Sequence, residues 1–236
     1  MKAPSGAAPA LESTSFKERA RRWAHVALDP VTSLLHRAGV GPDVLTISGL
    51  LISITAAIVF LAGHFRHGAA LVAASGLCDV LDGELARRSG RRSRFGAFLD
   101  STLDRLSDGL VLAGIAGFYV VHLYELVLDP PAAAAEIGRG LDPRVWAIVA
   151  LTAMLALVGS FMVSYTRARA EGLGLECKVG WFERPERTVL LIVAASFGVG
   201  RWMSLALMLL AILSFWTATQ RVAHIWKQTR GAGQDS

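Results

Sequence analysis

The chain has 236 residues, of which 53% are hydrophobic, and its mean hydropathy of +0.45 excludes an ordinary soluble domain. Its two cysteines, Cys78 and Cys177, exclude a disulfide framework. The formal net charge of +5 says less than the places where the basic residues gather along the chain.

The residues before the first long apolar run are expected to lie on a membrane surface. Residues 1–14 are small and polar and are predicted to be disordered. Within residues 15–41, apolar side chains recur at helical spacing against a basic face, which is typical of amphipathic interfacial helices. Asp29 and Pro30 resemble a helix cap followed by proline at the first helical position. Packing on another protein is the alternative for this segment.

Residues 42–228 contain six apolar runs, which predict six transmembrane helices in one membrane domain. With the interfacial helix, they predict an all-α, polytopic integral membrane protein. The tail at 229–236 is predicted to be disordered. The six predicted spans are Val44–Gly63, His67–Arg88, Phe95–Leu123, Arg144–Glu171, Arg184–Val199 and Trp202–Lys227.

Basic residues gather on one side of this predicted topology. They fill the segment before the first span and the second and fourth connections, and they return at the end of the sixth span. The third connection instead carries Glu125, Asp129, Glu136 and Asp142. Because basic loops stay on the cytoplasmic side, we expect both termini in the cytoplasm and the protein in the plasma membrane.

The densest polar feature lies where the second span gives way to the third. Asp79, Asp82, Asp100 and Asp104 place four carboxylates within 26 residues. Their i,i+3 and i,i+4 spacings put each pair on one helix face, and two facing pairs form an oxygen cage suited to hard divalent cations. Asp108, one turn further on, is expected to have a structural role. Solvated helix ends are the alternative reading of the four aspartates.

A transporter or channel that uses intramembrane aspartates is an alternative from another functional class. It predicts carboxylates near the middle of the membrane and helices broken within a span. The aspartates instead cluster at one cytoplasmic edge, beside a basic connection. This placement favours a site that receives a lipid and a soluble molecule together.

The acidic segment resembles the CDP-alcohol phosphatidyltransferase family, whose motif is D-x2-D-G-x2-A-R-x8-G-x3-D-x3-D. Every fixed position is met, and the six-span layout is also similar. The resemblance implies transfer of a phosphatidyl group from a CDP-linked lipid to an alcohol, with release of CMP, by a homodimer that binds no nucleic acid. The matching residues are Asp79, Asp82, Gly83, Ala86, Arg87, Gly96, Asp100 and Asp104.

The same resemblance implies two Mg²⁺ ions in each active site, with Mn²⁺ as the alternative metal. It implies that Asp79 and Asp100 contact both ions, that Asp82 contacts one and that Asp104 contacts the other. It also implies Asp104 as the base that takes the acceptor hydroxyl proton in a direct displacement.

The family further implies a binding site for the CDP-lipid around the motif. Arg87 and Gly83 are implied to contact its pyrophosphate, with Ser93 as a helper, while the small residues Ala86 and Gly96 permit close approach. The stretch Asp43, Val44, Leu45 and Thr46 is implied to contact the cytidine part. Simple capping of the helix that follows Pro42 is the alternative for that stretch.

Arginines near the later span ends predict a pocket for a phosphorylated acceptor. Arg167, Arg187 and Arg221 are suited to hold a phosphate, although positive-inside anchoring is the alternative. The A-R-A-E and E-R-P-E-R segments resemble the phosphatidylinositol-phosphate synthase branch, which implies inositol 1-phosphate as acceptor. Arg167 stands where that branch has lysine, so glycerol 3-phosphate remains the alternative acceptor.

Overall fold

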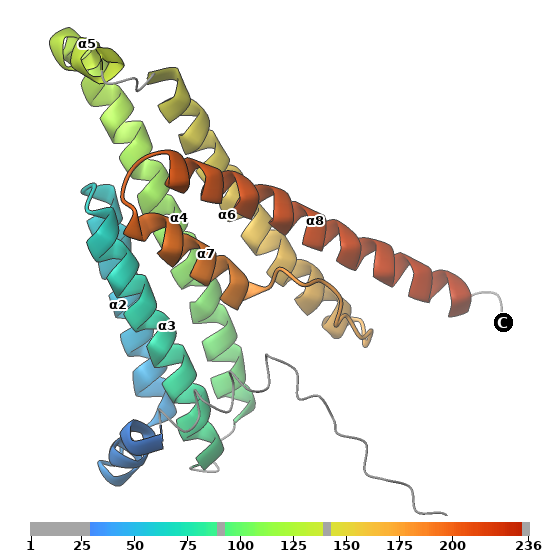
Figure 1. Ribbon diagram of the computed structural model, residues 1–236. Helices are drawn as coiled ribbons and strands as arrows, with labels where there is room; N and C mark the ends of the chain where they lie inside the picture. The colour runs from blue at the N-terminus through green and yellow to red at the C-terminus, as the bar shows by residue number, and fades with distance from the viewer. Residues whose placement is uncertain (1–28, 89–92, 139–142, 233–236) are drawn as a thin grey trace, which may run out of the picture.

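The computed structural model describes residues 29–88, 93–138 and 143–232, and every regular element in these ranges is a helix (Figure 1). The all-α prediction is therefore confirmed. Residues 29–37 form a helical segment that precedes the named helices. The named helices are α2 (Pro42–Leu61), α3 (Phe65–Arg88), α4 (Arg94–Leu128), α5 (Pro130–Gly138), α6 (Pro143–Gly172), α7 (Arg184–Ser196) and α8 (Arg201–Ala232).

Within the described residues, four helices are long and apolar enough to cross a membrane, namely α2, α4, α6 and α8. The count of six spans is not confirmed. The helix α3 has 24 residues, but charged side chains at its end lower its apolar content. The helix α7 has only 13 residues, which at 1.5 Å each falls short of a hydrocarbon core of about 30 Å.

Two boundaries differ from the expectation drawn from sequence. The third connection contains the helix α5, because its alanine run favours a helix and the Asp129 carboxylate accepts a hydrogen bond from the Ala132 amide at 3.1 Å. The helix α8 continues to Ala232, beyond the expected start of the tail at residue 229. The expected disorder of residues 1–14 and the interfacial helix over residues 15–28 lie outside the described residues.

Small residues let the long helices approach closely. The helix α2 packs against α3 and α4, α6 packs against α4 and α8, and α7 packs against α3 and α8. A Cβ atom on Gly114 of α4 would lie 2.3 Å from the Ala57 carbonyl oxygen of α2, and one on Gly159 of α6 would lie 2.9 Å from Ser214 of α8. Such close crossings are typical of helices that associate in membranes.

Large apolar side chains cover much of the outer surface of these helices. Leu51 on α2, Leu151 on α6 and Ile212 on α8 are all exposed. Such a surface is unfavourable in water and suited to contact with lipid chains. Together with the four apolar helices, it makes the chain a membrane-embedded protein.

The helical segment at 29–37 is attached to the end of α3. The Arg88 guanidinium pairs with the Asp29 carboxylate and also donates a hydrogen bond to the Ser33 hydroxyl at 2.9 Å. Gly39, with φ of 73°, turns the chain toward α2. The contact between Arg88 and Asp29 holds this segment against the end of α3, the helix that carries Asp79 and Asp82.

Candidate active site

The acidic motif lies on two helices that present their aspartates to one another. Asp79 and Asp82 lie near the end of α3, and Asp100 and Asp104 lie in the first turns of α4. Each of Asp82, Asp100 and Asp104 lies within electrostatic range of Asp79. Asp82 is buried and the other carboxylates are half-buried. The i,i+3 and i,i+4 spacings thus gather the four acids at one place, as the sequence predicts.

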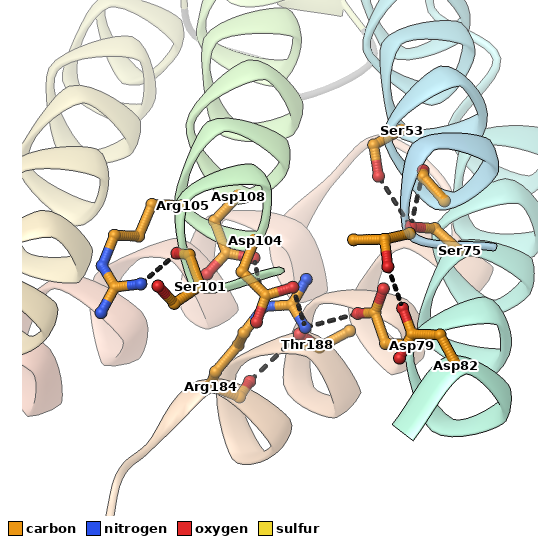
Figure 2. Close-up of polar contacts among 12 residues, drawn as sticks. Ser53, Ser75, Asp79, Asp82, Ser101, Asp104, Arg105, Asp108, Arg184 and Thr188 are labelled. Atoms are coloured by element: carbon orange, nitrogen blue, oxygen red, sulfur yellow. Dashed lines mark hydrogen bonds and ion pairs between the residues drawn. The ribbon is translucent and has the colours of Figure 1, made fainter. Parts of the chain in front are cut away.

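The four aspartates together form an acidic wall, and the start of α2 lies beside it. The Thr46 hydroxyl donates a hydrogen bond of 2.7 Å to the buried Asp82 carboxylate. A Cβ atom on Gly49 would lie 3.3 Å from an Asp79 carboxylate oxygen, so α2 passes directly beside that group. One turn further along, the Ser53 and Ser75 hydroxyls are 2.8 Å apart and join α2 to α3 (Figure 2). These contacts fix the position of the α3 carboxylates.

Arg184 lies between the two acidic helices. Its Nη1 atom lies 2.5 Å from Asp79 Oδ2 and 3.1 Å from Asp104 Oδ1, and its Nε atom lies 3.3 Å from Asp108 Oδ1. Figure 2 shows the guanidinium with Asp79 on one side and Asp104 and Asp108 on the other. One cation from α7 thus neutralises carboxylates on both α3 and α4.

Asp108 links this guanidinium to a second arginine. Its Oδ2 atom lies 3.1 Å from Nη2 of Arg187, which is only 5% exposed. The other terminal nitrogen of Arg187, Nη1, is buried and finds no hydrogen-bond partner in the described part of the chain. The structural role expected for Asp108 is therefore to hold Arg184 and Arg187 side by side.

The start of α7 carries both arginines because the segment Glu183–Arg187 folds as a helix start. Pro185 occupies the first turn, and Glu183 and Glu186 form a capping box in which the Glu186 carboxylate accepts from the Glu183 amide at 3.2 Å. The α6–α7 connection thus ends where α7 begins, next to α4. The local sequence therefore points two guanidinium groups toward the acidic motif.

A polar cavity of about 330 Å³ joins the acidic motif to the predicted acceptor arginines. Asp100 and Asp104 line it together with an arginine wall made of Arg167, Arg187 and Arg221. Ser101, Arg105, Asp108, Ser164, Glu171, Glu183 and Arg184 also line it. Side chains that are up to 121 residues apart in sequence thus face one space.

The three predicted acceptor arginines differ in how they are held. Arg221 is 2% exposed and donates to the Val179 carbonyl at 3.0 Å, to the Val163 carbonyl at 2.6 Å and to the Glu183 carboxylate at 2.9 Å. Arg167 is exposed and pairs with Glu171 at 2.9 Å and with Glu183 at 3.5 Å.

Arg221 thus serves first to tie α8 to the α6–α7 connection. Arg187, with its unpartnered buried nitrogen, and Arg167, whose partners are exposed carboxylates, are the arginines best able to exchange a partner for an anion.

The residues predicted to bind a CDP-lipid lie at the same end of the bundle as the four aspartates. Their contacts differ from one residue to the next. The Ser93 hydroxyl caps α4 by accepting from the Gly96 amide at 2.8 Å. A Cβ atom on Gly96 would lie 3.7 Å from an Asp43 carboxylate oxygen, so the start of α2 meets the start of α4. Arg87 pairs with Glu84 at 2.5 Å and lies close to Gly83.

The remaining predicted donor residues are Val44, which is exposed, and Leu45 and Ala86, which are half-buried. They lie on the same helix ends as Asp82 and Thr46 and form a half-open rim around the acidic wall.

A second cavity, of about 400 Å³, lies on the other side of Arg184 and is mostly apolar. Asp79, Asp108, Arg184 and Arg187 form its polar end. Its remaining walls come from six helices, with Val72, Val80, Val111, Leu112, Val189 and Leu210 among the apolar side chains. The Arg184–Asp108–Arg187 group therefore separates a polar cavity from an apolar one.

The four aspartates suit hard divalent cations in donor type, because carboxylate oxygens are the ligands that such ions prefer. The space between Asp79 and Asp104 also holds a positive charge, the Arg184 guanidinium. Within the described residues, no three acidic, histidine or cysteine side chains are close enough to hold an ion as they lie. The cage predicted from sequence is thus present in its parts but is not closed.

Arg184 is the main residue of the site that sequence reasoning did not single out. From the sequence, Arg187 is the only arginine of the E-R-P-E-R segment that is predicted to bind the acceptor. Arg184 and Arg187 are three residues apart on one helix and therefore lie on the same face. This spacing is the sequence feature that indicates a role for Arg184 beside Arg187.

Comparisons with known proteins agree with the motif. The family model for CDP-alcohol phosphatidyltransferases matches residues 40–219. Archaetidylinositol phosphate synthase of Methanothermobacter thermautotrophicus is 39% identical over 207 residues, covering 86% of this chain and 90% of that protein. Phosphatidylinositol phosphate synthase of Streptomyces avermitilis is 34% identical, covering 96% and 88%.

Two solved structures of Mycobacterium tuberculosis phosphatidylinositol phosphate synthase are similar to the fold. The structure with CDP-DAG bound is 34% identical, with a TM-score of 0.68, and the match covers 84% of this chain and 92% of that one. The structure in complex with manganese and citrate is 33% identical, with a TM-score of 0.68 and coverage of 84% and 88%.

Proposed function

The chain belongs to the CDP-alcohol phosphatidyltransferase family, and we propose that it transfers the phosphatidyl group of CDP-diacylglycerol to inositol 1-phosphate. The products are phosphatidylinositol phosphate and CMP. The observation that carries this proposal is the polar cavity in which Asp100 and Asp104 face Arg167, Arg187 and Arg221. A phosphorylated alcohol in that cavity meets both carboxylates and guanidinium groups.

The names of the relatives support the acceptor more firmly than the donor. Archaetidylinositol phosphate synthase and phosphatidylinositol phosphate synthase differ in the lipid part of the name and share inositol phosphate. The shared part matches the arginine wall of the polar cavity, because guanidinium groups hold phosphate oxygens with paired hydrogen bonds.

We propose that Asp79, Asp82, Asp100 and Asp104 hold two divalent cations, Mg²⁺ with Mn²⁺ as the alternative. Asp79 and Asp100 would each contact both ions, Asp82 would contact one and Asp104 would contact the other. The carboxylate oxygens fit such ions in donor type. Bound there, the ions supply charge neutralisation for a pyrophosphate and its leaving group. Thr46 orients Asp82 for this role through its hydrogen bond.

Asp104 is the proposed base of a direct displacement. It lines the polar cavity together with the arginines, so its carboxylate faces the acceptor side of the site. It takes the proton of the acceptor hydroxyl as that oxygen bonds to the lipid-side phosphorus of the CDP-lipid. The bond between that phosphorus and the bridging oxygen breaks, and CMP leaves with the bonding electrons.

The arginine wall positions the acceptor. Arg187 offers its buried Nη1 to the acceptor phosphate, and Arg167 exchanges Glu171 or Glu183 for the same group. Arg221 keeps its protein contacts and adds fixed positive charge. Holding the acceptor phosphate beside the arginines directs the acceptor hydroxyl toward Asp104. Binding of the phosphate thus orients the reacting hydroxyl.

The CDP-lipid is proposed to approach the other side of the aspartates. Gly83, Ala86, Arg87, Ser93 and Gly96 form the proposed rim for the pyrophosphate. Asp43, Val44, Leu45 and Thr46 at the start of α2 form the proposed cytidine contact. Their place at the starts of α2 and α4 and the end of α3 supports this role, since Asp43 already lies beside Gly96.

The membrane arrangement follows from the same site. We propose that α3 and α7 cross with the four long helices, so that residues 42–228 form a six-helix domain in the plasma membrane as a homodimer. α7 packs against α3 and α8, which supports its place in this bundle. The basic helix ends favour a cytoplasmic active site and cytoplasmic termini. The residues before α2 are proposed to lie on the inner membrane surface.

The test is an acceptor and donor panel. Purified full-length protein with Mg²⁺ is supplied with CDP-diacylglycerol or an ether-linked CDP-archaeol. Each donor is combined with inositol 1-phosphate, free inositol, glycerol 3-phosphate or serine, and CMP formation is measured. We expect CMP with inositol 1-phosphate and at most traces with the others. Faster turnover with glycerol 3-phosphate would replace the proposed acceptor, and no CMP with any pair would reject the function.

A further inference from the structure

Arg184 makes more contacts with the acidic motif than any other cation in the described residues. Its guanidinium contacts Asp79, Asp104 and Asp108, which belong to both acidic helices. All four side chains are at most 28% exposed, so the charges are only partly screened by water. This arrangement is costly to break unless another cation takes its place.

The oxygens that contact Arg184 are the ones that divalent ions would need. Nη1 lies against Asp79 Oδ2 and Asp104 Oδ1, which belong to two of the four proposed metal ligands. A carboxylate oxygen that faces a guanidinium at hydrogen-bond distance cannot turn the same lone pair toward an ion. Guanidinium and divalent ions therefore compete for these two aspartates.

Asp108 gives the guanidinium a second place to stay. It contacts Nε of Arg184, and it is not one of the four motif carboxylates. Arg184 lines both the polar and the apolar cavity, so loss of its Nη1 contacts leaves it within the site. Divalent ions would compete with Arg184 for Asp79 and Asp104, but they would leave its contact with Asp108 in place.

On the premise of the proposed function, we propose that Arg184 is the resident counter-cation of the aspartate motif. It holds Asp79 and Asp104 together before divalent ions bind, and the ions displace its Nη1 from both. The contact with Asp108 persists, so the displaced charge stays beside Arg187 at the edge of the acceptor cavity. Arg184 is thus a positioning residue that opposes metal binding and preserves the site until the metal arrives.

The test measures Mn²⁺ binding by metal-stripped full-length protein in detergent micelles, with free Mn²⁺ followed by electron paramagnetic resonance. Arg184→Gln removes the competing charge, so we expect Mn²⁺ to bind about tenfold more tightly or better. We also expect the metal-free variant to unfold at a lower temperature than the wild type, and Mn²⁺ to raise that temperature by more.

The matched control is Arg105→Gln. Arg105 lines the same cavity and lies within electrostatic range of Asp100, but its guanidinium donates to the Ser101 carbonyl. Loss of this charge is expected to tighten Mn²⁺ binding by no more than about threefold, because only a through-space effect remains. An equal gain from both variants would overturn direct competition by Arg184.

Further variants separate failure of this inference from failure of the proposed function. Mn²⁺ binding by the wild type that vanishes in Asp100→Asn places the ion at the motif. Binding there with an unchanged or weaker affinity in Arg184→Gln would overturn the inference alone. An absence of Mn²⁺ binding in the wild type would overturn the metal assignment and the inference with it.

Should Arg184→Gln fail to fold, Arg184→Lys answers the same question. A lysine keeps the charge but lacks the fork that contacts several carboxylates at once, so an intermediate gain in affinity is expected. An affinity equal to the wild type would then overturn the proposal.

Discussion

The two halves of α4 are held to the rest of the bundle in different ways. Near its start, Asp104 and Asp108 contact Arg184 through ion pairs. Near its other end, rings pack together: Phe118 lies 5.0 Å from Phe65, and His122 lies 4.3 Å from Trp146, measured between centroids. One helix thus joins a charged region to an aromatic one.

The difference indicates where the molecule holds its function and where it gains stability. Partly buried carboxylates are unfavourable unless paired, so four at one membrane edge are difficult to explain by stability. Stacked and tilted rings bury large apolar area and contribute to stability directly. Substitutions at the acidic start should therefore change turnover, and substitutions at the aromatic end should change folding.

The largest effect is expected at Asp104. Asp104→Asn removes the proposed base and should lower the rate of CMP release by about a thousandfold. CDP-lipid binding and the unfolding temperature should change little. The measurement is CMP release at saturating donor and acceptor, beside a binding assay for the CDP-lipid. Asp129→Asn, at the far end of α4, is the control. Full activity in Asp104→Asn would reject the assigned base.

At the aromatic end, Trp146→Ala should cost about 3 kcal/mol of stability, because it empties a buried ring position. The Michaelis constants and the turnover of the protein that remains folded should be unchanged. Thermal unfolding in detergent and steady-state kinetics measure the two quantities. Trp216→Ala, on the exposed face of α8, serves as control. A selective loss of turnover without a loss of stability would contradict the division between the two ends.

Arg187→Ala should act on the acceptor more than on the chemical step. We expect the Michaelis constant for inositol 1-phosphate to rise about thirtyfold, because a charged hydrogen bond to phosphate is lost. The constant for the CDP-lipid should stay within about twofold of the wild type. Arg169→Ala is the control, since Arg169 is exposed and does not line the polar cavity. An unchanged acceptor constant would remove Arg187 from the phosphate pocket.

The smallest effect is expected at Thr46, which supports the acidic end indirectly. Thr46→Val removes the 2.7 Å hydrogen bond to Asp82 and should lower turnover about fivefold. It should also weaken Mn²⁺ binding by a similar factor. Thr55→Val is the matched control, because the Thr55 hydroxyl donates only to the Leu51 carbonyl of its own helix. Equal losses in both variants would show that the hydroxyl acts through helix packing instead.

The sequence predicted the all-helical architecture and most of the helices, because helix formation depends on local spacing. The predicted first span Val44–Gly63 and the helix Pro42–Leu61 differ by two residues at each end. Asp79 and Asp82 share a face through their separation of three residues alone. The motif also predicted the family, which the comparisons confirm.

What the sequence could not supply depends on contacts between distant segments. The interaction of Arg184 with Asp79 joins residues 105 positions apart, and no local period indicates it. The hydrogen bond from Arg221 to the Val163 carbonyl joins residues 58 positions apart, and it shows that this arginine ties helices together. The count of six membrane spans is not confirmed, because α7 is short and packs against α3 and α8.

The most direct test of the account is the mass of the lipid product. Purified protein is incubated with Mg²⁺, CDP-diacylglycerol and inositol 1-phosphate, and the extracted lipid is analysed by mass spectrometry. The account predicts a lipid that carries the donor phosphate and the acceptor phosphate together, formed in equal amount with CMP. A lipid with one phosphate, or CMP without a new lipid, would contradict a cavity that binds the acceptor through its phosphate and activates its hydroxyl.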